Sequence, residues 1–514
     1  MAVQPYEILP ASAIRPEAEA VRCGDDWLSW ANLEMRARRF ANGLRVEGVG
    51  PGEVWSLLAK NRMEWVEAAL GNGRNGSRYV PLNWHLTVPE LSELLVDSGA
   101  SVLMVDPSLE SLGREAAASA GVNRIIVLGP DYEEWLHGHS DAPLPVGPLG
   151  SPLQYTGGTT GRSKGVVRPD LKGSAIELPS LYGAWGELTG MPADDHILLC
   201  TPAYHALGAA VLRASLARGN RLDILDGWSP GEALRTIHDR SIAGAALVPT
   251  QLIQLLKQPE QERRRHDISS IKWILHTAAS CPPWVKRGMI EWFGPVVVEL
   301  YGSAEGIGPV IATSSDWLER PGTVGRATSA IELSIVDDQG MDLPAGEVGT
   351  IYAKRRDGSP EYFGDSEKTA LMLLPDGRFT VGDLGWLDED GFLFLAGRRV
   401  DLIITGGTNV YPAEVEAVLS QHPSIADVAV FGIPDKYWGQ QVKAVVEVRP
   451  GLILDESQVI AYAAERLAPF KVPKSVDIVD SLPREASGKL RKHLLSDPYW
   501  EGSDVPAELA MEES

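Results

Sequence analysis

The chain has 514 residues, more than one hydrophobic core usually organises, so we expect at least two domains. Its formal net charge of −22 argues against a nucleic acid or an anionic membrane as the main partner, because either would repel it. Three scattered cysteines are too few for a disulfide framework or a zinc site and fit a reducing cytoplasm. We find no signal-peptide pattern, and no apolar run approaches the roughly 20 residues of a membrane span.

The first 300 residues alternate helical and strand patterns. Residues 33–44 repeat apolar side chains at helical spacing, whereas residues 54–59 and 102–105 have the continuous apolar character of buried strands. Residues 87–90, Thr-Val-Pro-Glu, predict a capping box that opens a helix. This alternation is typical of an α/β core with largely parallel sheets.

Residues 330–397 change character, because short β-like runs separated by Gly, Pro and Asp turns predict a compact β subdomain. A second unit follows, with a strand at 402–404, a turn at 406–409 and a helix opened by Pro412. We therefore predict an α/β fold: a large N-terminal domain of parallel-rich sheets with a β subdomain, and a small mobile α+β C-terminal domain. The expected bounds are 1–398 and 399–514, with a hinge at 399–401 and a mobile acidic tail at 501–514.

Residues 155–165 form the strongest local motif, Tyr-Thr-Gly-Gly-Thr-Thr-Gly-Arg-Ser-Lys-Gly. Its glycines let the backbone approach phosphate oxygens closely, its hydroxyl side chains add donors, and Lys164 adds a positive charge. The segment does not fit the Walker pattern. A plain flexible loop is the structural alternative, which this concentration of glycine, hydroxyl and basic residues disfavours.

This loop closely resembles the nucleotide-phosphate loop of the adenylate-forming superfamily, which includes acyl-CoA synthetases, firefly-type luciferases and peptide-synthetase adenylation domains. The resemblance extends from about residue 25 to residue 494. Residues 83–87 and 281–283 look most like the bacterial fatty-acyl-CoA synthetase branch. The resemblance implies an AMP- and pyrophosphate-forming ligase that uses ATP, Mg²⁺ and coenzyme A.

Several further segments match the superfamily in order. Residues 301–305 resemble the segment in which an aromatic ring stacks on adenine and Glu305 holds Mg²⁺, and a carboxylate is a suitable ligand for that ion. Asp383 matches the residue that binds the ribose hydroxyls, although Asp is also common in turns. The nucleotide residues that the resemblance implies are Thr156, Gly157, Gly158, Thr159, Thr160, Gly161, Lys164, Ala279, Ser280, Tyr301, Gly302, Asp383 and Arg398.

The resemblance implies three catalytic residues: Lys489 in a Ser-Gly-Lys segment, His205 beside the acyl carboxylate, and Glu305. Without this context, Lys489 is a solvated surface lysine and His205 a structural histidine. The resemblance also makes Asp401 the pivot of the hinge and places Gly406 and Gly407 against the pantetheine arm of coenzyme A. The expected walls of the acid pocket are Tyr204, Ala206, Leu207, Ala278 and Ile307.

Two positions depart from the superfamily pattern. Ala304 stands where a threonine hydroxyl usually contacts the nucleotide phosphate, and Thr408 stands where Glu, Val or Phe is frequent. These departures leave room for a diazotase, which adenylates nitrite and passes it to an aromatic amine. A homologue that binds nucleotide without turnover is a third reading, which Lys489, Glu305 and Asp383 oppose. The sequence leaves the acid and the oligomeric state open, a homodimer included.

Overall fold

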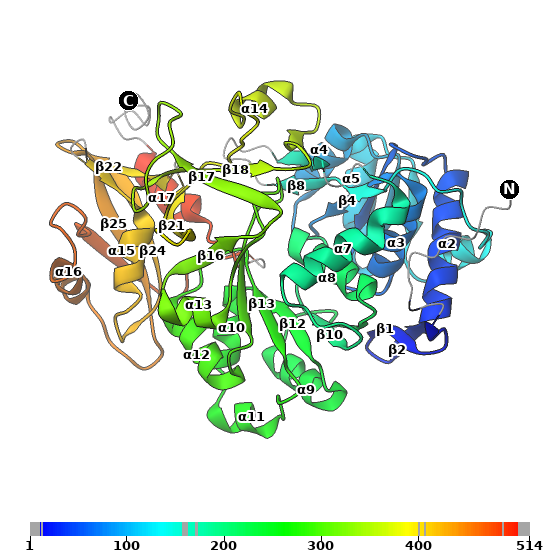
Figure 1. Ribbon diagram of the computed structural model, residues 1–514, viewed down its shortest axis with the longest axis horizontal. Helices are drawn as coiled ribbons and strands as arrows, with labels where there is room; N and C mark the ends of the chain where they lie inside the picture. Colours follow the sequence, from blue (N-terminus) through cyan, green and yellow to red (C-terminus); the bar gives the residue numbers. More distant parts are fainter. Residues whose placement is uncertain are drawn as a thin grey trace.

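The computed structural model describes residue 11 and residues 14–156, 163–169, 173–398, 401–405, 408–485 and 488–501. These residues build four sheets (Figure 1). No helix among them is long and apolar enough to cross a membrane. All three cysteines are free.

The first sheet is parallel, with strand order β6-β5-β3-β4-β7, and lies on the N-terminal side of the molecule (Figure 1). The predicted capping box is confirmed, because the Thr87 N–H donates to the Glu90 carboxylate over 2.7 Å at the start of α4. The elements are α2 (Trp30–Val46), β3 (Val54–Leu58), α3 (Glu64–Asn75), β4 (Arg78–Leu82), α4 (Val88–Ser98), β5 (Val102–Val105), η1 (Pro107–Leu109), α5 (Glu110–Ala120), β6 (Arg124–Val127), α6 (Pro130–His137) and β7 (Ser151–Pro152).

The second sheet has 13 strands in the order β17-β18-β20-β21-β16-β15-β14-β13-β12-β10-β11-β1-β2. Its core from β1 to β14 is parallel and its flank from β14 to β17 is antiparallel. The predicted β subdomain at 330–397 contributes β17, β18, β20 and β21 to this flank, which also includes β15 and β16 and has its own hydrophobic cluster. The strands are β1 (Glu19–Cys23), β2 (Asp26–Ser29), β10 (His196–Leu199), β11 (Arg221–Ile224), β12 (Gly244–Leu247), β13 (Trp273–His276), β14 (Val297–Tyr301), β15 (Val310–Ala312), β16 (Thr323–Ala327), β17 (Ile331–Val336), β18 (Gly349–Arg355), β20 (Asp383–Leu387) and β21 (Phe392–Arg398).

Helices cover this large sheet and connect its strands. Because parallel strands end at one edge, the loops that follow β10, β12, β13 and β14 gather there. The helices are η3 (Ala175–Glu177), α7 (Leu178–Leu188), α8 (Ala206–Ala217), α9 (Pro230–Arg240), α10 (Pro249–Leu256), α11 (Glu260–Arg265), α12 (Pro283–Phe293) and α13 (Ser314–Glu319).

A small antiparallel sheet joins two segments that are far apart in the chain. Strand β9 (Lys164–Val167) pairs with β8 (Gln154–Thr156) on one side and with β19 (Glu361–Tyr362) on the other. Helix α14 (Ser366–Leu371) follows β19. This sheet holds both described ends of the predicted phosphate loop.

The C-terminal residues form a separate sheet with its own core (Figure 1, orange to red). Thr408 and Asn409, predicted in a turn, instead begin a strand. The predicted bounds 1–398 and 399–514 stay a prediction, and the described part of the tail ends at Glu501. The elements are β22 (Ile403–Thr405), β23 (Thr408–Val410), α15 (Pro412–Leu419), β24 (Ile425–Asp435), β25 (Gly439–Val448), α16 (Glu456–Ala464), β26 (Ser475–Val479) and α17 (Lys492–Trp500).

Candidate active site

The residues predicted to hold the ribose lie in direct contact. Strands β20 and β21 pair Asp383 with Arg398, and the Arg398 Nε donates to Asp383 Oδ1 over 3.0 Å. The Tyr301 hydroxyl, at the end of β14, donates to Asp383 Oδ2 over 2.8 Å. Burial and the neighbouring Asp383 carboxylate raise the pKa of Tyr301, so its phenol stays protonated. Two donors therefore orient the Asp383 carboxylate. Gly302, which follows Tyr301 in the chain, is exposed.

The predicted phosphate end is built around Glu305, which is 7% exposed. The hydroxyls of Thr156 and Tyr362 each lie 3.4 Å from Glu305 Oε1. Lys164 Nζ lies 5.0 Å from the centroid of the Tyr362 ring. Burial, followed by the charge of Lys368, lowers the pKa of Lys164. Gly157, Gly158, Thr159, Thr160 and Gly161 lie outside the described residues.

The surroundings of Glu305 fit a bound divalent cation. Among the described residues its carboxylate meets hydroxyl groups, and no lysine or arginine forms an ion pair with it. A buried carboxylate without a cationic partner is costly, and Mg²⁺ takes oxygen ligands of this kind. That Glu305 holds the ion stays a prediction.

His205 lies on the loop between β10 and α8, directly before the first helical residue. Its ring centroid lies 4.3 Å from that of Tyr204. Burial lowers the pKa of His205 to about 4, opposed by the Glu485 carboxylate and reinforced by His85. His205 is therefore neutral at pH 7 and can accept or donate a hydrogen bond without adding charge. The buried Tyr204 hydroxyl has no partner among the described residues.

The other predicted pocket residues divide into two groups. Ala206 and Ala278 are exposed, and Ala278 has a φ of 78°, a left-handed conformation that strains a residue other than glycine and is typical of functional sites. Leu207 packs against the main core. Ile307 is 1% exposed and packs with Ala353 and Phe379, so it belongs to a core cluster and its role as a pocket wall stays a prediction. Ala279 and Ser280 continue the loop after β13.

Lys489 is exposed and lies in a hairpin whose described residues are 483–485 and 488–491 (the lysine hairpin). Arg484 fixes this hairpin: its guanidinium binds both carboxylate oxygens of Asp427 over 2.7 and 2.8 Å and donates to Gly488 O over 2.9 Å. Arg484 also pairs with Leu490 across the hairpin. The sequence motif contains Arg484, but its partner is 57 residues away and gave no local signal.

The lysine hairpin rests on the large N-terminal part. A Cβ built on Gly488, which has a φ of 82°, would lie 3.2 Å from Thr250 Oγ1 and 3.5 Å from Val248 Cβ. Only glycine therefore fits this approach without strain. The Glu485 carboxylate opposes burial and raises the pKa of His205. Burial lowers the pKa of His85, and the charge of Arg491 lowers it further. The hairpin thus faces the end of the site that carries His205.

The predicted hinge and pantetheine loop are described only in part. Asp401 lies before β22, but Arg399 and Val400 are outside the described residues. Gly406 and Gly407 are also outside them. The neighbouring Thr408 is exposed at the start of β23. Their roles stay predictions.

The comparisons with known proteins agree with this geometry. The family described as "AMP-binding enzyme" matches residues 11–363, and "AMP-binding enzyme C-terminal domain" matches residues 414–489. The chain is 34% identical over 486 residues to the feruloyl-CoA synthase of an Amycolatopsis species, covering 93% of this chain and 95% of that protein. It is 32% identical over 509 residues to the medium/long-chain-fatty-acid–CoA ligase FadD8 of Mycobacterium tuberculosis, covering 93% and 87%.

A solved structure extends the likeness to the fold. ATP-bound MatB from Rhodopseudomonas palustris superposes with a TM-score of 0.85 at 29% identity, covering 96% of this chain and 99% of that one. The chain therefore belongs to the AMP-binding enzyme family. Its class is that of the adenylate-forming acid–CoA ligases, near the fatty-acyl-CoA synthetases as the motifs predict.

Proposed function

We propose that this protein activates a carboxylic acid with ATP as an acyl-adenylate and transfers the acyl group to coenzyme A. The observation that carries the proposal is the approach of the lysine hairpin to the loop of His205, with Gly488 against Thr250 and Glu485 near His205. A lysine delivered there meets developing negative charge between an acid and a nucleotide.

The first half-reaction forms one bond and breaks one. A carboxylate oxygen of the acid attacks the α-phosphorus of ATP, and the bond from that phosphorus to the bridging oxygen breaks, releasing pyrophosphate. Lys489 would stabilise the charge on the α-phosphate, and Lys164 would hold the outer phosphates. Mg²⁺ on Glu305 would supply a second positive charge on the phosphates. Neutral His205 would orient the acid carboxylate without repelling or trapping it.

The second half-reaction requires a different arrangement. The sulfur of coenzyme A attacks the acyl carbon, the bond from that carbon to the AMP oxygen breaks, and the thiol proton passes to solvent. For the thiol to enter, the lysine hairpin has to leave the acid end, and a turn of the small domain about Asp401 would achieve this. Gly406 and Gly407 would then border the pantetheine arm. The three free thiols support a reducing, cytoplasmic setting.

The test is pyrophosphate release across a panel of acids, each with and without coenzyme A. The relatives suggest ferulate and a medium-chain fatty acid as first members, and nitrite with an aromatic amine tests the diazotase alternative. We expect acid-dependent pyrophosphate release and a thioester product that appears only with coenzyme A. Turnover with nitrite and amine but with no carboxylic acid would overturn the proposal.

A further inference from the structure

The loop that carries His205, residues 200–205, is held by an amide side chain from a distant segment. Asn61 Nδ2 donates to Thr201 O over 3.1 Å, and Asn61 Oδ1 accepts from the Ala203 N–H over 2.8 Å. The two contacts span 140 and 142 residues of sequence. Asn61 is 8% exposed, so these bonds form away from water, where an unpaired backbone group is costly.

Two further amides hold the ends of the same loop. Gln251 Nε2 donates to Cys200 O over 3.0 Å, and Gln154 Nε2 donates to Tyr204 O over 3.0 Å. Together with Asn61, they provide four hydrogen bonds to the backbone of one short loop. We name Asn61, Gln154 and Gln251 the amide cradle. None of the three carries a charge, so the cradle fixes the position of the loop without adding a net charge near His205.

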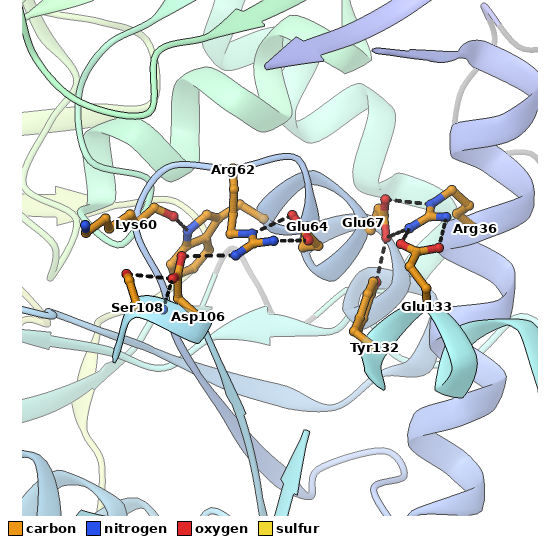
Figure 2. Close-up of polar contacts among 10 residues, drawn as sticks. Arg36, Lys60, Arg62, Glu64, Glu67, Asp106, Ser108, Tyr132 and Glu133 are labelled. Atoms are coloured by element: carbon orange, nitrogen blue, oxygen red, sulfur yellow. Dashed lines mark hydrogen bonds and ion pairs between the residues drawn. The ribbon is translucent and has the colours of Figure 1, made fainter. Parts of the chain in front are cut away.

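Asn61 is itself fixed by its neighbours. It lies at the corner between β3 and α3, and Figure 2 shows how this corner is tied down on the side of Arg62. The Arg62 guanidinium binds Glu64 over 2.6 and 2.8 Å and Asp106 over 3.1 Å. A polar group with a fixed backbone can set the position of the groups it binds. Asn61 therefore holds the His205 loop from a fixed corner of the first sheet.

The other two amides connect the loop to the rest of the site. Gln154 lies in β8, two residues before Thr156, which contacts Glu305. Gln251 lies in the first turn of α10, next to Thr250, against which Gly488 rests. The cradle thus joins the His205 loop to the strand entering the phosphate loop and to the helix that receives the lysine hairpin.

We propose that Asn61, Gln154 and Gln251 are positioning residues that hold His205 at the acid end of the site. This inference rests on the function proposed above. Side chains from three segments satisfy backbone groups of one loop that would otherwise need water. A displacement of about 1 Å at a reacting group can cost roughly 100-fold in rate, so such a loop has to be fixed.

The test is Asn61→Ala with a matched control, Asn220→Ala. Asn220 is 0% exposed and makes the same two kinds of bond, accepting from the Asp195 N–H over 2.9 Å and donating to Pro192 O over 2.8 Å. It lies at the opposite end of β10, so both variants lose an equivalent buried amide. We expect Asn61→Ala to lower kcat/KM for the acid by roughly 10–100-fold, with ATP affinity unchanged. Asn220→Ala should lose similar thermal stability and change neither parameter.

A second measurement needs no substrate. The imidazole of His205 faces Tyr204, His85 and Glu485, and its titration can be followed by NMR and assigned with His205→Gln. In Asn61→Ala the loosened loop admits water, so the pKa of His205 should rise from about 4 toward the ordinary value near 6.5. It should not move in Asn220→Ala.

The outcomes separate the two proposals. Equal kinetic losses in both variants, or a His205 titration that moves in neither, would overturn the cradle. If Asn61→Ala does not fold, Gln154→Ala replaces it, because Gln154 is only partly buried and the same two measurements apply. If no acid drives pyrophosphate release in the unmodified protein, the proposed function fails, while the NMR titration still decides whether the cradle holds His205.

Discussion

The loop of His205 and the lysine hairpin face each other, but they are held in different ways. The His205 loop is bound by buried and half-buried amides inside the large N-terminal part. The lysine hairpin is bound to its own small sheet by Arg484 and Asp427, and it only rests on the large part through Gly488. We therefore expect the His205 loop to stay in place and the lysine hairpin to be carried to it.

The energies of the two attachments also differ, because the His205 loop is held more strongly than the small sheet. Unpairing a buried backbone group costs about 1–3 kcal/mol, so the His205 loop is expensive to move. The contacts of the small sheet with the large part include an ion pair of Lys257 with Glu447 at 3.3 Å and the Arg449 guanidinium 4.6 Å from the Trp284 ring. Partly exposed contacts of these kinds contribute about 0.2–1 kcal/mol each. A ligase that alternates between two half-reactions needs this asymmetry.

The largest effect is expected at Lys489, which the lysine hairpin carries. Lys489→Ala should lower the rate of adenylation roughly 10²–10³-fold, because a preorganised charge at the α-phosphate is lost. Thioester formation from a supplied acyl-adenylate should continue, because the proposed turn of the small domain would remove the lysine from the acid end. Rapid-quench assays of both half-reactions measure this. Lys471→Ala, which breaks a surface pair with Glu414, is the control, and equal loss in both half-reactions would contradict the role of Lys489.

The next effect tests how the hairpin is fixed. Arg484→Lys keeps a positive charge beside Asp427 but loses the paired contact and the bond to Gly488 O. Hydrogen bonds to charged groups contribute about 1.5–3 kcal/mol, so we expect adenylation to fall about tenfold or more. Thioester formation should change less. Arg466→Lys, at an exposed pair with Glu465, is the control. A uniform loss in both half-reactions would mean that Arg484 only stabilises the fold.

Local patterns predicted the fold class and most of the elements. Asp383, Arg398 and Tyr301 were expected at one site and lie in contact, since strand pairing and the end of β14 bring them together. Contacts across long stretches of sequence were missed. Tyr362 beside Glu305 and Asn61 beside the His205 loop leave no periodic signal, because a hydrogen bond between distant segments depends on the packed fold.

Ile307 shows a second limit of the sequence. An apolar residue after Glu305 predicts a pocket wall or a core position equally well, since both exclude water. The structure packs its side chain with Ala353 and Phe379. Only the direction in which the side chain points distinguishes a pocket wall from a core position, and composition does not give that direction.

The protonation of His205 should make the free energy of unfolding depend on pH. The pKa of His205 is about 4 in the fold and near 6.5 in the unfolded chain, so between these values the unfolded chain binds the extra proton. The free energy of unfolding therefore falls as pH falls from 6.5 to 4. His205→Gln removes this contribution, so its slope should be shallower by up to about 1.4 kcal/mol per pH unit. Urea unfolding at pH 7, 6 and 5 measures it, and identical slopes would contradict the buried, neutral state.

A smaller change is expected at Ala304, which belongs to the large N-terminal part. Ala304→Thr restores a hydroxyl where relatives contact the nucleotide phosphate, and a neutral hydrogen bond is worth about 0.5–1.5 kcal/mol. We expect ATP affinity by calorimetry to rise a few-fold, with turnover of the best acid kept. Loss of both would mean that the added methyl and hydroxyl clash, and would favour a differently placed nucleotide or the nitrite alternative.

The smallest effect tests how weakly the small sheet is held. Lys257→Glu places two carboxylates together, and Glu447→Lys places two ammonium groups together, so each substitution should disfavour the docked arrangement. A pair of this exposure is worth about 0.2–1 kcal/mol, which corresponds to roughly a 1.5- to 5-fold shift. We expect each variant to lower adenylation relative to thioester formation by that factor.

The double variant Lys257→Glu with Glu447→Lys restores opposite charges at the same positions and should return the ratio of the two half-reactions to its original value. Recovery identifies the pair itself as the cause, because general damage to α10 or β25 would accumulate rather than cancel. The effect should also shrink in high salt, since the pair is partly exposed. If both single variants keep the original ratio at low salt, this contact does not hold the small sheet in the docked arrangement.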